Sequence, residues 1–146
     1  MTTRPINHSD LIPITGVYSH RISLPIIPGY EGIGIVEEVG HCVSHELIGQ
    51  RVLPLRGEGT WQEFVKTSVE FIVPIPDVID DYTAAQLYIN PITAWIACTE
   101  VLHLRQDDVL IVNACGSSIG RIGILYATQC YSFNHRAFIG DVHKLG

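Results

Sequence analysis

The stretch Val109-Leu-Ile-Val-Asn-Ala-Cys-Gly-Ser-Ser-Ile-Gly120 decides the fold that this sequence predicts. Its first four residues, 109–112, are aliphatic without polar alternation, which is typical of a strand buried on both faces of a parallel sheet. The small residues at 113–118 predict a turn, and apolar residues then recur at helical spacing over 119–126. The segment therefore predicts a buried strand, a tight turn and a helix in direct succession.

This order of elements is suited to holding a dinucleotide. Small side chains let the backbone approach a pyrophosphate, and the start of the helix offers free N–H groups with a partial positive charge. Gly120 would permit close packing of the helix against the strand. A strict GxGxxG motif is absent, so the segment alone leaves two interpretations open: a cofactor-binding turn, or a tight turn whose small residues serve packing.

The sequence before residue 80 differs in composition from the sequence after it. Seven of the eight prolines lie in the first part, together with short β-branched runs that predict strands at 33–39, 51–55, 61–67 and 71–75. Closely spaced short strands predict a small barrel or sandwich.

The second part begins with helical patterns. Helices are predicted over 83–87 and from Asn90-Pro91, with Asn90 as N-cap, to about His103. A strand over 136–142 would complete one β-α-β unit with the segment at 109–126. We therefore predict domain 1 over 1–80, connecting helices over 81–104, and a partial Rossmann domain over 105–146.

The overall composition excludes several classes of protein. The chain has 146 residues, of which 47% are hydrophobic and only 16% charged, which excludes a disordered chain. A net charge of −6 without any Lys/Arg run argues against binding nucleic acid or an anionic membrane surface. No apolar run approaches the roughly 20 residues of a membrane span.

The N-terminal segment and the cysteines predict a cytoplasmic location. Residues 1–7 are polar, contain Pro5 and lack the apolar block of a signal peptide. The four cysteines, at positions 42, 98, 115 and 130, form neither a CxxC pair nor a disulfide-dense scaffold. We interpret them as reduced cytosolic thiols.

Six groups of short motifs follow one another in the order of one known family. They are Ile6-Asn-His-Ser-Asp10 with Thr15-Gly-Val-Tyr18, Pro28-Gly-Tyr-Glu-Gly-Ile-Gly-Ile-Val36, Ile48-Gly-Gln-Arg-Val52, Gly59-Thr-Trp61, Asn90-Pro-Ile-Thr-Ala94 and the stretch ending at Gly120. On these motifs the chain resembles the medium-chain dehydrogenases/reductases, and within them the zinc-free quinone oxidoreductases and 2-enoyl thioester reductases. Ala114, Ser117 and Gly120 stand where most members read GxxGxxG, which is similar to the mitochondrial enoyl reductases.

The resemblance implies an α+β chain in which a GroES-like β-barrel catalytic domain precedes the first β-α-β of a Rossmann domain. Family members run to more than twice this length, so we expect a truncated enzyme with an incomplete cofactor domain. Because a buried-type strand needs neighbours on both sides, we also expect exposed apolar surface around Val109–Val112 and its helix.

No metal site is predicted. The family's catalytic zinc needs Cys and His ligands around an open position. The corresponding residues here are Asn7, Tyr30 and Ile89, and the four-cysteine structural zinc lobe is missing. The remaining candidate is the pair at either end of His41-Cys-Val-Ser-His45, for which a solvated turn is the preferred interpretation.

Tyr18 is the predicted catalytic residue. Hydride addition to an enoyl thioester builds negative charge on the thioester oxygen and finally needs a proton at the α-carbon. A tyrosine, with a pKa near 10, is a protonated donor at neutral pH. The resemblance assigns that role to the tyrosine of Gly16-Val17-Tyr18; the alternative is an amphipathic tyrosine at a domain rim.

The resemblance also implies a set of cofactor contacts. Asn90 and Thr93 match residues that contact the nicotinamide half, whereas Gly116, Ser117, Ser118 and Ile119 match the phosphate-binding turn. The alternatives are a helix N-cap for Asn90, a first-turn hydroxyl for Thr93, and packing for the turn.

Three further family positions are predicted to be structural. Asp10, Glu31 and Trp61 are interpreted as a carboxylate network with an aromatic plug. Asp141 lies where an acid could bind ribose hydroxyls, but its surroundings depart from the family pattern.

These expectations combine into a zinc-independent, NADPH-dependent reductase of activated C=C bonds acting on a small-molecule enoyl thioester or a quinone/enone. The alternative is a non-catalytic fragment without competent cofactor binding. We expect the 146-residue chain alone to bind NADPH weakly or not at all and to show negligible activity. Homodimers are common in the family, although the usual dimer strand is absent here.

Overall fold

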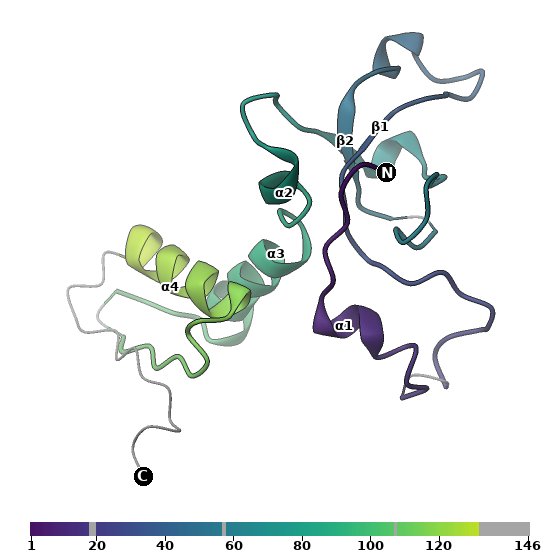
Figure 1. Cartoon of the computed structure of the whole chain (residues 1–146). Helices are drawn as coiled ribbons and strands as arrows, with labels where there is room; N and C mark the ends of the chain where they lie inside the picture. The colour runs from purple at the N-terminus through teal and green to yellow at the C-terminus, as the bar shows by residue number, and fades with distance from the viewer. Residues whose placement is uncertain (18–19, 57, 107, 132–146) are drawn as a thin grey trace. The chain divides into compact units, whose positions relative to one another are not determined.

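The computed structural model describes residues 1–17, 20–56, 58–106 and 108–131 (Figure 1). The chain divides into two compact units, Met1–Tyr88 and Ile89–Gly146. Within the described residues, no helix is long and apolar enough to cross a membrane.

The first unit is built on a three-stranded antiparallel sheet in the order β1-β2-β3. Its strands are β1 (Gly34–Ile35), β2 (Arg51–Pro54) and β3 (Ile72–Pro74). The register pairs Gly34 with Val52, and Leu53 with Val73. These shorter strands confirm the ones predicted within 33–39, 51–55 and 71–75, while 61–67 forms no strand, so that prediction was wrong.

The core of this unit lies where the sheet meets a short helix, α2 (Asp81–Ala84). Ile33, Leu53, Ala84 and Ala85 are buried together, and three partly buried residues pack against them: Leu55, Ile75 and Ile79. Two single-turn 3-10 helices, η1 (His45–Leu47) and η2 (Val69–Phe71), and the first helix, α1 (His8–Leu11), complete the unit.

An ion pair fixes α2 onto the sheet, and a second acid caps the helix. The guanidinium of Arg51, on β2, contacts the Asp81 carboxylate at 2.5 Å and donates to the carbonyl oxygens of Pro76 and Ile79. Asp80 caps α2, because its carboxylate accepts from the backbone N–H of Thr83 at 3.0 Å and from the Thr83 hydroxyl at 2.7 Å. These hydrogen bonds hold the pKa of Asp80 below its ordinary value.

The second unit is helical within its described residues. Helix α3 (Ile89–Ile96) continues directly into a π-helical turn, η3 (Ala97–Val101), and packs against α4 (Ser118–Tyr131) (Figure 1). The helix predicted over 119–126 is confirmed and extends further. Helix α3 begins one residue before Asn90, so Asn90 lies in its first turn and the N-cap prediction was wrong. The start of a helix is set by its backbone hydrogen bonds, and a favourable N-cap residue does not by itself fix that start.

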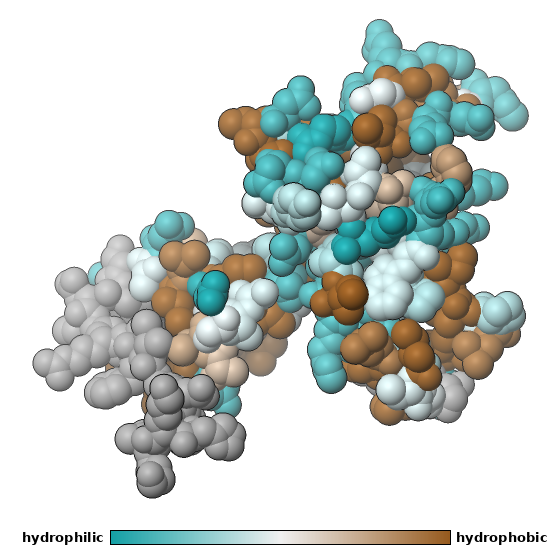
Figure 2. Space-filling view, in the orientation of Figure 1, coloured by the Kyte–Doolittle hydropathy of each residue, from teal (hydrophilic) through white to brown (hydrophobic). Residues whose placement is uncertain are grey.

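Val109–Val112 is the main departure from the sequence-based expectation. No strand forms there, and only Val112 takes part in an isolated bridge. The side chains of Val109 and Ile111 are 69% and 79% exposed, which confirms the expected exposed apolar surface. Figure 2 shows hydrophobic side chains at the surface of both units. A strand requires neighbouring strands for its hydrogen bonds, and this segment pairs with none within the described residues. The strand predicted over 136–142 lies outside the described residues.

Candidate functional site

A network around two buried carboxylates forms the polar centre of the first unit. Asp10, on α1, is 1% exposed. Its two carboxylate oxygens accept from backbone N–H groups, one from Asn7 at 2.7 Å and the other from Tyr30 at 3.0 Å. Asp10 therefore holds the start of α1 against the segment that precedes β1.

Glu31 is the second buried carboxylate, also 1% exposed. One of its oxygens accepts from the Asn7 side-chain amide at 2.6 Å, and its backbone carbonyl accepts from the hydroxyl of the buried Thr60 at 2.8 Å. Asn7 thus bonds to both acids, through its backbone to Asp10 and through its side chain to Glu31. Sequence reasoning did not select Thr60, whose position between Gly59 and Trp61 was its only signal.

Trp61 closes this network against a glycine. Gly29 has a φ of +95°, a backbone conformation that favours glycine, and a side chain there would meet Thr60 and the Trp61 ring. The Trp61 N–H donates to the Pro28 carbonyl at 3.0 Å, and its indole N–H lies 3.4 Å from the Pro5 carbonyl oxygen. Asp10 and Glu31 thus form a buried carboxylate network joined through Asn7, and the Trp61 ring lies against Gly29; that all three serve structure rather than catalysis stays a prediction.

The donor set at the positions where zinc-binding relatives carry their ligands does not fit zinc. Asn7 offers an amide whose N–H already donates to Glu31, and the Tyr30 side chain is 41% exposed. Among the described residues, no group of three or more His, Cys, Asp or Glu side chains could hold a metal ion. His41 and His45 are exposed, and His45 begins η1 rather than standing on an α-helix with His41, as the solvated-turn interpretation predicted.

The turn before α4 is the second candidate site. Ala114 has a φ of +49°, a left-handed conformation that costs a non-glycine residue about 1 kcal/mol or more. Its carbonyl accepts from the Ser117 N–H at 2.9 Å. The Ser117 hydroxyl oxygen accepts from the Gly120 N–H at 3.1 Å, so Ser117 caps the helix.

Gly120 lets α4 approach this turn closely. A Cβ on Gly120 would lie 2.8 Å from the Ala114 carbonyl oxygen and from the Cys115 Cα, too close for any side chain. The predicted need for glycine is confirmed, although the close partner is the turn itself rather than a strand.

Three backbone N–H groups in this turn are free. Those of Gly116, Ser118 and Ile119 donate to no acceptor in the described part of the chain. Gly116 also has open space on the side where a Cβ would stand. Free N–H groups at the start of a helix attract anions, because the helix dipole adds a partial positive charge.

The structure describes two of the remaining predicted site residues, Asn90 and Thr93. Asn90 is buried, at 7% exposure, and Thr93 stands one turn further along α3 with its hydroxyl donating to the Ile89 carbonyl at 2.7 Å. Thr93 is exposed. Tyr18 and Asp141 lie outside the described residues.

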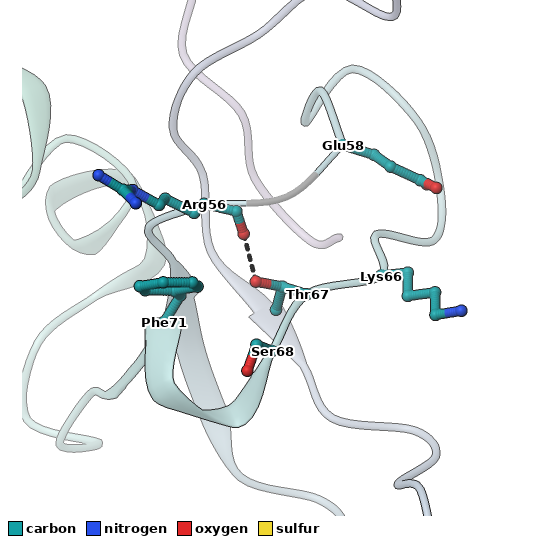
Figure 3. Close-up of a pocket in the computed structure, with 6 residues that line it drawn as sticks. All are labelled: Arg56, Glu58, Lys66, Thr67, Ser68 and Phe71. Carbon is teal, nitrogen blue, oxygen red and sulfur yellow. Dashed lines mark hydrogen bonds between the residues drawn. The ribbon is translucent and has the colours of Figure 1, made fainter.

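An open hollow on the first unit contains none of the predicted residues (Figure 3). It has a volume of about 550 Å³ and is lined by Arg56, Glu58, Lys66, Thr67, Ser68 and Phe71. The Arg56 guanidinium lies 5.1 Å from the centre of the Phe71 ring, and the Thr67 hydroxyl donates to the Arg56 carbonyl. Arg56 and Lys66 point in opposite directions in Figure 3, so their charges do not converge on one ligand.

Comparison with known proteins identifies the class of this fold. Residues 1–77 match the profile of the alcohol dehydrogenase GroES-like domain. The chain therefore belongs to that family, within the medium-chain dehydrogenase/reductase superfamily of oxidoreductases.

The curated relatives are longer proteins. The mitochondrial enoyl-acyl-carrier-protein reductase of Xenopus tropicalis is 36% identical over 130 residues, which is 88% of this chain and 37% of the relative. The human synaptic vesicle membrane protein VAT-1 homolog-like is 34% identical over 116 residues, which is 80% of this chain and 28% of the relative. The chain thus spans less than two fifths of either relative.

Solved structures give the same fold. A Bacillus thuringiensis protein, described as a candidate NADPH:quinone reductase, is 70% identical with a TM-score of 0.83. The match covers 89% of this chain and 39% of the Bacillus thuringiensis chain. A mycobacterial protein solved in complex with NADPH is 27% identical with a TM-score of 0.73, covering 84% of this chain and 38% of its own.

Proposed function

We propose that this chain carries the substrate-side domain and the phosphate-binding turn of a zinc-independent, NADPH-dependent reductase of activated C=C bonds. The observation that carries the proposal is the turn before α4, where the N–H groups of Gly116, Ser118 and Ile119 donate to no described residue and the missing side chain of Gly120 permits the close approach of the helix. Support also comes from the 27% identical mycobacterial protein, which was solved with NADPH.

In this proposal one set of residues would bind the cofactor, and another residue would donate a hydrogen bond to the substrate. NADPH, when bound, supplies the hydride. The free N–H groups of the turn would bind its phosphates, and Asn90 and Thr93 would contact its nicotinamide half. The Tyr18 hydroxyl would donate a hydrogen bond to the substrate oxygen that becomes negative, which stabilises the transition state.

The substrate class is an α,β-unsaturated carbonyl compound. The names of two relatives, an enoyl-acyl-carrier-protein reductase and a candidate quinone reductase, share this chemistry, because an enoyl thioester and a quinone both conjugate a C=C bond to a carbonyl group. The buried network of Asn7, Asp10 and Glu31 would shape the domain without contributing a metal.

A chimera tests the proposal in a full-length protein. Residues 1–130 of this chain would replace the matching segment of the 70% identical Bacillus thuringiensis protein. The purified chimera should oxidise NADPH with crotonyl thioester or a benzoquinone as acceptor, measured by loss of nicotinamide absorbance. The Tyr18→Phe chimera should lose about 10²-fold or more in kcat/KM with unchanged NADPH affinity.

The controls separate the parts of the proposal. Equal kcat/KM in the Tyr18→Phe chimera would remove Tyr18 from the catalytic role. An inactive but folded chimera, beside an active parent protein, would favour the non-catalytic alternative. One equivalent of zinc in the active chimera, by elemental analysis, would contradict zinc independence.

A further inference from the structure

The segment Val109–Val112 has the sequence of an interior strand but not the surroundings of one. Its four residues are aliphatic, without the polar alternation of a strand that faces water on one side. Val109 and Ile111 are 69% and 79% exposed, whereas Leu110 and Val112 are half-buried. This alternation is typical of an extended chain, so one face of the segment is partly covered and the other face is open to solvent.

The backbone of this segment is open as well. Val109, Leu110 and Ile111 make no backbone hydrogen bond within the described residues, and Val112 takes part only in an isolated bridge. Peptide N–H and C=O groups need partners once they are removed from water. A partner that covered the apolar face without pairing these groups would therefore leave them unsatisfied, whereas an added strand would satisfy them.

The residue types of the segment are not those of a natural sheet edge. Edge strands are usually protected from pairing by charged side chains or proline. Val109–Val112 contains neither, and the nearest charged residue is Asp108, just before the segment. The segment is instead suited to a place between two neighbouring strands.

The second unit predicts only one neighbouring strand of its own. That strand, over 136–142, lies outside the described residues. A strand inside a sheet has two edges, so a neighbour on one edge leaves the other edge open. The second edge requires a strand from another part of a larger protein or from another polypeptide.

The length of the Bacillus thuringiensis protein indicates a source for that strand. Its match covers 89% of this chain with a TM-score of 0.83, but only 39% of the Bacillus thuringiensis chain. More than half of that protein therefore lies outside the match, and this portion is large enough to supply further strands.

We propose that Val109–Val112 is a docking edge for a second polypeptide, equivalent to the part of the Bacillus thuringiensis protein outside the match. The partner adds a strand beside the segment, pairs with its open backbone groups, and covers Val109 and Ile111 with apolar side chains. We expect the added strand to be parallel, because continuous aliphatic strands are typical of parallel sheets. The docking edge is independent of the proposed reductase function, since it requires neither Tyr18 nor bound NADPH.

A cleavable fusion tests the docking edge. All 146 residues of this chain would be joined to the part of the Bacillus thuringiensis protein outside the match, through a flexible linker that contains a site for a sequence-specific protease. The two parts fold as one chain before the linker is cut, so the partner does not have to fold alone. As a second measurement, the two polypeptides would be co-expressed without a linker, with an affinity tag on this chain.

We expect the two polypeptides to remain together after cleavage, as measured by size-exclusion chromatography with light scattering, and to co-purify after co-expression. Ile111→Asp should raise the Kd of the complex by about tenfold or more, because it places a charge in the covered face. Ile111 is 79% exposed in this chain, so the substitution should leave the Tm of the chain alone unchanged. The matched control is Val78→Asp, at a 90% exposed valine of the first unit, which should leave the Kd unchanged.

Three outcomes would overturn the proposal. The first is separation of the two polypeptides after cleavage. The second is an equal Kd for the Ile111→Asp and Val78→Asp complexes. The third is a dimer of this chain alone that Ile111→Asp dissociates, because the occupant of the edge would then be a second copy. A stable complex that binds no NADPH would contradict the proposed function and support the docking edge.

Discussion

At the scale of single residues, Asn7 connects the two buried carboxylates of the first unit. Its backbone N–H donates to Asp10 and its side-chain amide donates to Glu31, and both carboxylates are 1% exposed. A carboxylate removed from water is stable only with such donors. Asparagine is therefore suited to this position as a structural donor, in the place that a zinc ligand takes in the metal-containing relatives that the chain resembles.

Substitution of Asn7 tests this role. Asn7→Asp keeps the size of the side chain but places a carboxylate 2.6 Å from the Glu31 oxygen. The two adjacent carboxylates, at positions 7 and 31, could stay buried together only if they held a proton between them. The pKa of this carboxylate pair in the folded variant should therefore be raised above the unfolded value near 4. Stability relative to the native chain should be lost as pH rises above about 4, the value at which the unfolded chain gives up these protons, measured by thermal unfolding at each pH.

The matched control is Asn7→Ala, which removes the donor without adding charge. It should destabilise by about 1–3 kcal/mol, because a buried charged acceptor loses a hydrogen bond, with a weaker pH dependence than Asn7→Asp. If the destabilisation by Asn7→Asp did not grow with pH, the side-chain contact with Glu31 would not be the interaction that matters.

At the scale of elements, α4 and its preceding turn depend on one glycine. Helical periodicity in the sequence predicts α4, but its closeness to the turn follows from the missing Cβ of Gly120. The Ser117 cap and the left-handed Ala114 then complete the turn. Ala114 stands at the first glycine of the GxxGxxG pattern of the family that the chain resembles. Its left-handed backbone is strained by the Cβ, whereas a glycine in the same conformation would carry no such strain.

Gly120→Ala should force α4 away from the turn. The added methyl group would meet backbone atoms that cannot rotate aside, so we expect a loss of about 1–3 kcal/mol in unfolding free energy. In the chimera, NADPH affinity should fall as well, measured by fluorescence titration.

Gly123→Ala provides the comparison on the same helix. Gly123 is buried, but a Cβ there meets no atom of the described residues within 4 Å, so the substitution should stabilise α4 by about 0.5–1 kcal/mol. Equal effects of the two substitutions on NADPH affinity would mean that helix propensity, rather than the close approach at Gly120, controls the turn.

At the scale of the whole molecule, the two units have different degrees of organisation. The first unit has a sheet, a buried core and a bonded network. The described part of the second unit has helices and a capped turn, but its expected strand, Val109–Val112, is reduced to an isolated bridge at Val112, and Val109 and Ile111 are exposed. In open α/β sheets, ligands bind at the carboxyl ends of paired strands, and that feature is missing from the described residues.

We therefore expect the purified 146-residue chain to bind NADPH at least about 100-fold more weakly than the chimera, because no strand precedes the turn within the described residues. Fluorescence titration of both proteins under one buffer condition measures the ratio. Tight binding by the chain would show that the turn and α4 suffice for cofactor binding.

The sequence by itself determined the family, the helix after Ser117, the sheet segments at 51–54 and 72–74, and the absence of zinc-type ligands at Asn7 and Tyr30. These features depend on local periodicity, turn chemistry and residue type. Only the tertiary structure decided that Asn7 bonds to Asp10 and Glu31, that Gly120 packs on its own turn, that α3 starts before Asn90, and that Val109–Val112 forms an isolated bridge instead of a strand. Those outcomes depend on contacts between distant segments, because a hydrogen bond or a strand exists only when its partner is in place.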